Sequence, residues 1–345
     1  MEGLRYVYLR RVIAPILRAL GPRVSERMAR RLARGVAELG TPGRQVAERR
    51  IAACIGATNV DERPGRIALA MYEHVARFWI EALFIRRLTE AKWRRYVTID
   101  GEAELELLAQ SRRPCVLATA YFGNPAVAAA ALGHIFRPIH VVADYLAQPQ
   151  LRAWQRELYG LSQVRVIQRH EAGAMIPRVL ENGGAVFLIC EQERVRGPAV
   201  ETEFLGRTLR CYPTLDRLAQ WYGATVVPVT CHRNDAPFSF TIQAEDGIVY
   251  SPDVGDVTRQ ALSALEVAVR RRPEQYLWSM PLVNRNAESI TRRESESASC
   301  PRRNRRATGW QRPSAGDTRQ GDSAGGVAPV PTSHRRAGHG GRRRG

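Results

Sequence analysis

Residues 115–132 have the sequence CVLATAYFGNPAVAAAAL, an apolar run and an alanine-rich run joined by a short break. The first six residues predict a strand, and the residues from 125 onward predict a helix that Gly133 ends. Many α/β enzymes place catalytic groups where a strand ends in a tight turn before a helix. The turn at 121–125, however, contains no His, Ser, Cys, Asp or Glu. The stretch therefore predicts an α/β fold without indicating its chemistry.

The same alternation of strands and helices continues along the chain. Runs such as AVFLIC at 185–190 and ATVVPVTC at 224–231 are apolar throughout, which is typical of strands covered on both faces of a sheet. The alternation predicts a mainly parallel central sheet flanked by helices. Strands are expected at 96–99, 115–120, 139–143, 164–167, 185–190, 225–231 and 238–243. Helices are expected at 103–110, 125–132, 150–160, 172–182, 215–222 and 257–270.

The N-terminal part of the chain is expected to be helical and basic. Residues 1–50 contain twelve Arg and four Glu, which gives a net charge of +8. Between 6 and 20, aromatic and aliphatic side chains mix with Arg, as in a helix that lies in a membrane interface. An amphipathic helix packed on the core has the same pattern, so both interpretations are kept. Residues 46–95 predict further helix with a broad buried face that includes Trp79.

Composition limits the remaining possibilities. The hydrophobic share of 44% excludes wholesale disorder, and the net charge of +18 favours anionic partners such as lipid headgroups, acidic carrier proteins or nucleic acid. Residues 286–345 are rich in Arg, Ser, Gly and Pro and predict a disordered basic tail. No nucleic-acid-binding module accompanies the tail, so no specific nucleic-acid binding is expected. The predicted organisation is a basic amphipathic N-terminus at 1–45, an α/β domain at 46–285 and the tail at 286–345.

The sequence shows neither a metal-binding pattern nor an ordinary membrane span. Its six Cys form no CxxC pair and no metal-ligand spacing. Three of them, Cys115, Cys190 and Cys231, lie in apolar runs where burial is expected. No uninterrupted apolar stretch reaches the about 18 residues that suggest a transmembrane helix.

Six segments in order resemble the motifs of the lipid A late acyltransferases, within the lysophospholipid acyltransferase-like superfamily. They are YEHVARF at 72–78, YFGNPA at 121–126, LENGGAVFLICEQ at 180–192, VETEFLG at 200–206, LAQWYGATVVP at 218–228 and RPEQYLW at 272–278. The resemblance covers about residues 5–285. It implies a glycerol-3-phosphate/lysophospholipid acyltransferase-like α/β fold with membrane-associating N-terminal helices.

The resemblance also implies an activity and a location. Such a protein transfers a fatty acyl chain from acyl carrier protein or acyl-CoA to a hydroxyl group of a membrane (glyco)lipid. It needs no cofactor beyond the acyl donor, and an anionic membrane lipid is its expected partner. It is expected at the cytoplasmic face of the inner (plasma) membrane, as a peripheral or N-terminally anchored protein.

The turn departs from the family pattern. Where the family has a His and, five positions later, an acid, this chain has Tyr121 and Ala126. With a reference pKa of about 10, only about 0.1% of a tyrosine is phenolate at pH 7, and alanine cannot orient a base. Glu191 stands where the family has an aspartate, and Arg156 falls near the family's arginine, so the resemblance makes both catalytic candidates. Substrate-binding roles are expected for the following residues: Phe122, Gly123, Asn124, Gln192 and Arg233.

Local chemistry adds expectations for the turn. Asn124 is suited to cap the following helix, Pro125 suits a first helical position, and backbone N–H groups there are candidates to hold an anion or oxyanion. Two functional hypotheses follow: an acyltransferase, or a catalytically inactive relative that binds lipid or acyl carrier or partners an active paralogue. His232 is the best placed of four histidines that were weighed as a replacement base; the other three are His134, His140 and His170.

Overall fold

The computed structural model describes residues 9–39, 42–57, 61–143, 160, 163–193, 197–252 and 256–279. These residues belong to one compact unit. Most of the helix expected at 150–160, including the predicted site residue Arg156, lies outside the described residues, as does the basic tail from 286.

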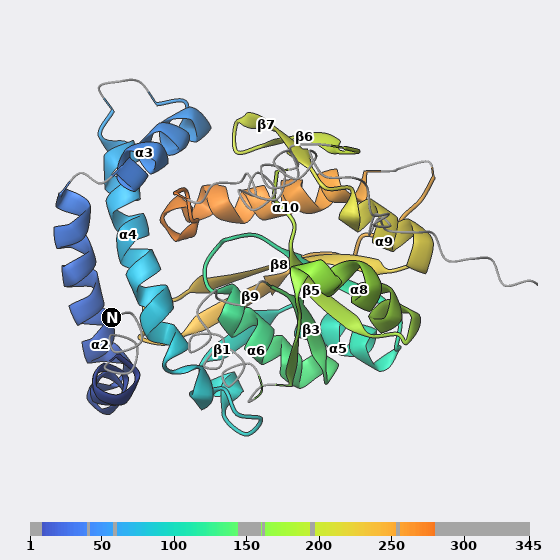
Figure 1. Ribbon diagram of the computed structural model, residues 1–345, viewed down its shortest axis with the longest axis horizontal. Helices are drawn as coiled ribbons and strands as arrows, with labels where there is room; N and C mark the ends of the chain where they lie inside the picture. Colours follow the sequence, from blue (N-terminus) through green and yellow to red (C-terminus); the bar gives the residue numbers. More distant parts are fainter. Residues whose placement is uncertain are drawn as a thin grey trace, which may run out of the picture. The chain divides into compact units, whose positions relative to one another are not determined.

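Among the described residues, seven strands form one sheet in the order β1-β9-β8-β2-β5-β3-β4 (Figure 1). The strands are β1 (Val97–Asp100), β2 (Cys115–Thr119), β3 (Ile139–Val142), β4 (Val164–Ile167), β5 (Ala185–Ile189), β8 (Thr225–Arg233) and β9 (Phe240–Ala244). Every neighbouring pair is parallel except β8 and β9. The expected mainly parallel sheet is confirmed. β2 lies at its centre, between β8 and β5, so the turn that follows β2 is held on both sides.

Helices cover both faces of the sheet. They are α5 (Glu102–Gln110), α6 (Pro125–Phe136), α8 (Ala172–Glu181), α9 (Thr214–Tyr222) and α10 (Val257–Arg271). The core on one face includes side chains of α8, α9 and α10, and the core on the other includes those of α5 and α6. β2 contributes to both, with Val116 and Ala118 on one side and Cys115 and Leu117 on the other. Burial of the three cysteines expected in the core is confirmed.

Two local expectations are corrected. α6 does not end at Gly133 but continues to Phe136, and Arg137 then takes a left-handed conformation before Pro138, which cannot extend a helix. The segment 200–206, noted only as a motif, belongs to an antiparallel hairpin of β6 (Val200–Phe204) and β7 (Arg207–Cys211). Its two-residue turn, Leu205 and Gly206, has positive φ at both positions, which matches the twist of the flanking strands.

Three longer helices precede the sheet: α2 (Ala14–Glu38), α3 (Pro42–Ile55) and α4 (Arg63–Ala82). α2 packs along α4, and the two lie side by side at one end of the sheet (Figure 1). α2 is kinked where Gly21, with φ of 75°, meets Pro22. Within the described residues, no helix has the length and apolarity needed to span a bilayer. Membrane association of these helices stays a prediction.

α4 buries a narrower face than its sequence suggests. Met71 and His74 are buried, but Trp79 is 50% exposed, which corrects the expectation that it lies in the buried face. Trp79 follows His74 by five residues, which turns its side chain about 140° away from the buried side of an α-helix. The side chain of Glu81, two residues after Trp79, is fully buried.

Candidate functional site

The turn after β2 is closely packed against the end of β8. Gly123 has φ of 60°, and a Cβ added to it would lie 1.5 Å from the carbonyl oxygen of Cys231. The N–H of Asn124 donates to the same oxygen at 2.9 Å. Only glycine fits this close approach and this conformation, so Gly123 fixes the path of the chain through the turn.

Asn124 caps α6, as its sequence position predicts. Its Oδ1 accepts hydrogen bonds from the N–H groups of Ala126 and Val127, both at 3.1 Å, and Pro125 occupies the first turn of the helix. The Asn124 Nδ2 group donates to Glu81 Oε2 at 2.7 Å. The cap side chain therefore connects the start of α6 to the end of α4.

The backbone N–H groups of the turn are already used within the protein. Those of residues 121–124 donate to Glu191 Oε1, the Ala120 carbonyl, the Gln275 carbonyl and the Cys231 carbonyl, in that order. Those of 126 and 127 donate to the capping Asn124. Contrary to the expectation from sequence, none of these groups is available to a substrate oxyanion in this structure.

Tyr121 and Glu191, both expected at the site, lie together. The Tyr121 N–H donates to Glu191 Oε1 at 2.5 Å, and Gln192 Nε2 donates to the Tyr121 hydroxyl at 3.2 Å. Gln192 Oε1 in turn accepts from Arg169 Nη1 at 2.6 Å. Ala126, at the position of the family's acid, contributes no side-chain polar group. The residues at the two dyad positions therefore make no polar side-chain pair with each other.

Glu191 is the unusual ionisable group at the turn. It is completely buried, and its Oε2 has no hydrogen-bond partner within the part of the chain that the structure describes. Burial raises the pKa of its carboxyl from 4.5 to about 7, although the hydrogen bond from the Tyr121 N–H opposes the rise. Near neutral pH the group is therefore divided between its protonated and charged forms. A carboxyl of this kind can take up or release a proton in the range where general bases work.

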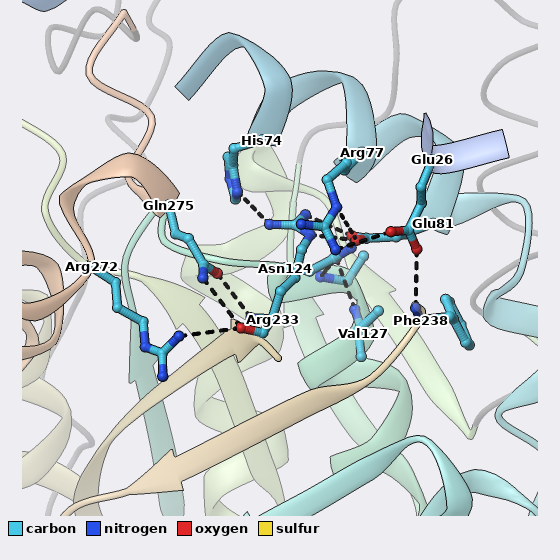
Figure 2. A network of polar contacts seen from close by, with 11 residues as sticks. Glu26, His74, Arg77, Glu81, Asn124, Val127, Arg233, Phe238, Arg272 and Gln275 are labelled. Carbon is cyan, nitrogen blue, oxygen red and sulfur yellow. Dashed lines mark hydrogen bonds and ion pairs between the residues drawn. The ribbon is translucent and has the colours of Figure 1, made fainter. Parts of the chain in front are cut away.

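Arg233 is engaged inside the protein (Figure 2). Its guanidinium is 2% exposed and binds both carboxylate oxygens of Glu81, including Nη2 to Oε2 at 2.6 Å. A third donor, Nη1, binds His74 Nδ1. Gln275 accepts from the Arg233 N–H at 2.9 Å and donates to its carbonyl at 3.3 Å. A substrate anion would have to displace Glu81 to reach this side chain, and its substrate role stays a prediction.

The same network extends to α2. Glu26 accepts from the Phe238 N–H at 3.0 Å and pairs with Arg77 at 3.0 Å, and Arg77 lies 4.0 Å from Glu81. Because a guanidinium only donates, His74 Nδ1 must accept, which places the ring proton on Nε2. Burial and then the charge of Arg233 lower the pKa of His74 well below its usual range, so the ring is neutral.

The four histidines weighed as replacement bases lie in different places. His134 is buried, donates to the Leu88 carbonyl at 2.7 Å and stacks on Trp93. His140 is half-buried at the start of β3, at the end of the sheet away from the turn, and His170 is exposed. His232 is half-buried near the end of β8, and burial followed by the charge of Arg272 lowers its pKa. No hydrogen bond of the described residues joins any of the four to Tyr121.

Sequence reasoning missed the partners that hold the site together. Glu81 had one available signal, an acid on the apolar side of a predicted helix. His74 and Gln275 lie in segments noted as motifs. His74 is 159 residues from Arg233 in the sequence and Gln275 is 42 residues from it, so no local pattern reveals that they pair with it. In the described part of the chain, no group of His, Cys, Asp or Glu is arranged to hold a metal ion.

Two comparisons with known proteins bear on the family of this chain. A family model described as bacterial lipid A biosynthesis acyltransferase matches residues 2–284. A comparison with curated protein sequences gives no significant match. The family match spans the N-terminal helices, the sheet, the turn with Glu191 and the 272–278 segment that contacts it. This chain belongs to the bacterial lipid A biosynthesis acyltransferase family.

Proposed function

We propose that the protein transfers a fatty acyl chain from acyl carrier protein or acyl-CoA to a hydroxyl group of a membrane (glyco)lipid, with Glu191 as the base. The observation that carries this proposal is the buried carboxyl bound to the turn, with a pKa of about 7 and one oxygen to which no described residue donates. Family membership supplies the reaction class. No metal or redox cofactor is part of the proposal.

The proposed step is a direct acyl transfer. The acceptor hydroxyl gives its proton to the Glu191 carboxylate while its oxygen attacks the thioester carbon. The carbon–sulfur bond breaks, and the thiolate leaves and takes up the proton. A base with a pKa near the working pH suits this proton transfer. Because Glu191 is completely buried, the proposal requires the turn to move when substrate binds.

A specific observation favours a second function, that of a non-catalytic relative which binds lipid or acyl carrier or partners an active paralogue. Tyr121 and Ala126 replace both members of the family's dyad. The turn amides are also internally bonded, so a developing oxyanion has no donor there in this structure. Such a protein would keep the substrate-binding surfaces and lack the transfer step.

Acyl-transfer assays on the full chain separate the two functions. Purified protein is incubated with radiolabelled acyl carrier protein or acyl-CoA and a panel of lysolipid and glycolipid acceptors. Transfer that falls at least about 100-fold in Glu191→Gln, with Glu104→Gln on the exposed side of α5 as control, supports the proposal. Equal transfer by wild type and Glu191→Gln would remove Glu191 from the mechanism. A silent wild type together with activity in Tyr121→His combined with Ala126→Glu establishes the non-catalytic function.

The proposal includes a location at the cytoplasmic face of the inner (plasma) membrane, with α2 as the contacting element. One side of α2 packs on α4, and apolar side chains that recur every four residues along the helix are exposed to solvent. These are Ile16, Leu20, Val24, Met28, Leu32 and Val36. Exposed arginines flank them, including Arg23, Arg27, Arg30 and Arg31. An apolar stripe beside guanidiniums is complementary to an anionic lipid surface.

Vesicle sedimentation tests this location. Full-length protein should sediment with vesicles that contain phosphatidylglycerol and less with pure phosphatidylcholine vesicles, because the arginines need anionic headgroups. Leu32→Asp should reduce sedimentation without changing stability, since Leu32 is 72% exposed. Leu107→Asp is the matched control, because Leu107 is 66% exposed on α5. Equal sedimentation of the two variants would exclude α2 as the contact.

A further inference from the structure

A cavity of about 460 Å³ lies between α3, the turn of the β6–β7 hairpin and residues 276–278. Its walls include aliphatic and aromatic groups of Val46, Leu205 and Trp278. It adjoins the turn after β2, because Leu277 N–H donates to the Tyr121 carbonyl at 3.0 Å. The neighbouring residue pairs by backbone with Phe122. The cavity is therefore a separate compartment beside the candidate site, with its own lining.

Positive charge gathers in this cavity. Arg49 and Arg50 reach it from α3, and Arg207 reaches it from β7. Arg207 has no ion-pair partner among the described residues. Burial and then the charge of Arg207 lower the pKa of Arg50, and Tyr276 and Glu193 oppose this less strongly. We call this lining the arginine pocket: Arg49, Arg50 and Arg207 together with Tyr276.

Two buried donors, one on Arg207 and one on Tyr276, have no acceptor among the residues that the structure describes. Arg207 Nη2 and the Tyr276 hydroxyl are both enclosed and have no hydrogen-bond partner in the described ranges, and Tyr276 as a whole is 2% exposed. A buried donor left unsatisfied is costly, so native proteins provide a partner for nearly all of them. Guanidiniums and a phenol together offer several donors to one anion with several oxygens, the arrangement that suits phosphate.

We propose that the arginine pocket binds the phosphate ester of an amphiphilic substrate, with the attached chain against Leu205 and Trp278. The inference rests on the proposed function for the identity of the ligand, because both the acyl donor and a phospholipid acceptor carry phosphate esters. The site itself rests on the cavity, the guanidiniums and the two unpaired donors. A phosphate held there lies next to Tyr276, between the pocket and the turn.

Direct binding tests the site without requiring catalysis. The full chain is titrated by calorimetry with inorganic phosphate, 4′-phosphopantetheine and a short-chain lysophosphatidic acid. Arg207→Gln should weaken binding of the preferred ester at least about tenfold, since a charge-assisted donor pair is lost. Tyr276→Phe should weaken it by a smaller factor of about three. Arg210→Gln is the matched control, because Arg210 lies on the same strand, is exposed and pairs with Glu201.

Each outcome decides a point. Tighter binding of 4′-phosphopantetheine assigns the pocket to the acyl donor, and tighter binding of lysophosphatidic acid assigns it to the lipid acceptor. No saturable binding, or equal loss in Arg207→Gln and Arg210→Gln, overturns the proposal. Binding of inorganic phosphate with no gain for either ester reduces the site to an adventitious anion site and also overturns it. Ester binding in a protein without transfer activity would reject the proposed catalysis and leave the site standing.

Discussion

Replacing Glu191 by glutamine should change how the stability of the protein depends on pH. In the folded protein the pKa of this carboxyl is about 7, against 4.5 for an ordinary glutamate. Between these values the folded state holds more protons than the unfolded state. The free energy of unfolding therefore falls as pH rises through this window. The two values differ by about 2.5 pH units, which at 1.36 kcal/mol per unit amounts to about 3 kcal/mol.

Glutamine keeps the acceptor for the Tyr121 N–H but cannot ionise. The stability of Glu191→Gln relative to wild type should therefore rise by about 3 kcal/mol between pH 4.5 and pH 8. Urea unfolding at several pH values measures this difference, and any constant cost of the amide cancels from it. Glu104→Gln, on the exposed side of α5, controls for the loss of a negative charge as such. A stability difference that stays constant from pH 5 to pH 8 would refute the raised pKa.

Three other substitutions test the packing around the site. Gly123→Ala should cost more than about 3 kcal/mol, because its Cβ would lie 1.5 Å from the Cys231 carbonyl oxygen; thermal unfolding near wild-type temperature would contradict the turn geometry. Glu81→Gln should destabilise by about 3–5 kcal/mol, since it leaves the Arg233 charge buried without its counter-ion; a loss below about 1 kcal/mol in urea would argue against the pair. Tyr276→Phe should stabilise the apo protein by about 1 kcal/mol, because it removes an unsatisfied buried hydroxyl, and a lower midpoint in urea would show that the hydroxyl has a partner.

Much of the fold was predictable because its signals are local. β4 lies at the expected residues 164–167, and α10 and α8 agree with expectation to within a residue at each end, since apolar periodicity and burial coincide there. The hairpin of β6 and β7 was missed because charged residues interrupt the apolar pattern of both strands: Glu201 and Glu203 in β6, and Arg207 and Arg210 in β7. The end of α6 was misplaced because Gly133 is a usual stop signal, and only the left-handed residue before Pro138 ends the helix.

The candidate site was predictable in position and only partly in chemistry. Motif order brought Tyr121 and Glu191 to the same place, and Asn124 capped its helix as its residue type predicts. The raised pKa of Glu191 could not be anticipated, because it comes from complete burial, a property of the packed chain. The pairing of Arg233 with Glu81 was hidden for a similar reason, since the two residues come from separate elements and meet only in the folded protein.

The ion pair between Glu26 and Arg77 has a consequence for how the protein can be shortened. Truncation before residue 39 is an obvious route to a more soluble protein, because it deletes the exposed apolar stripe of α2. It would also delete the carboxylate that accepts from the Phe238 N–H and neutralises Arg77. α2 therefore cannot be removed as a simple surface helix, because its Glu26 is part of the buried ion network. Soluble variants are better obtained by changing Met28 and Leu32 in place.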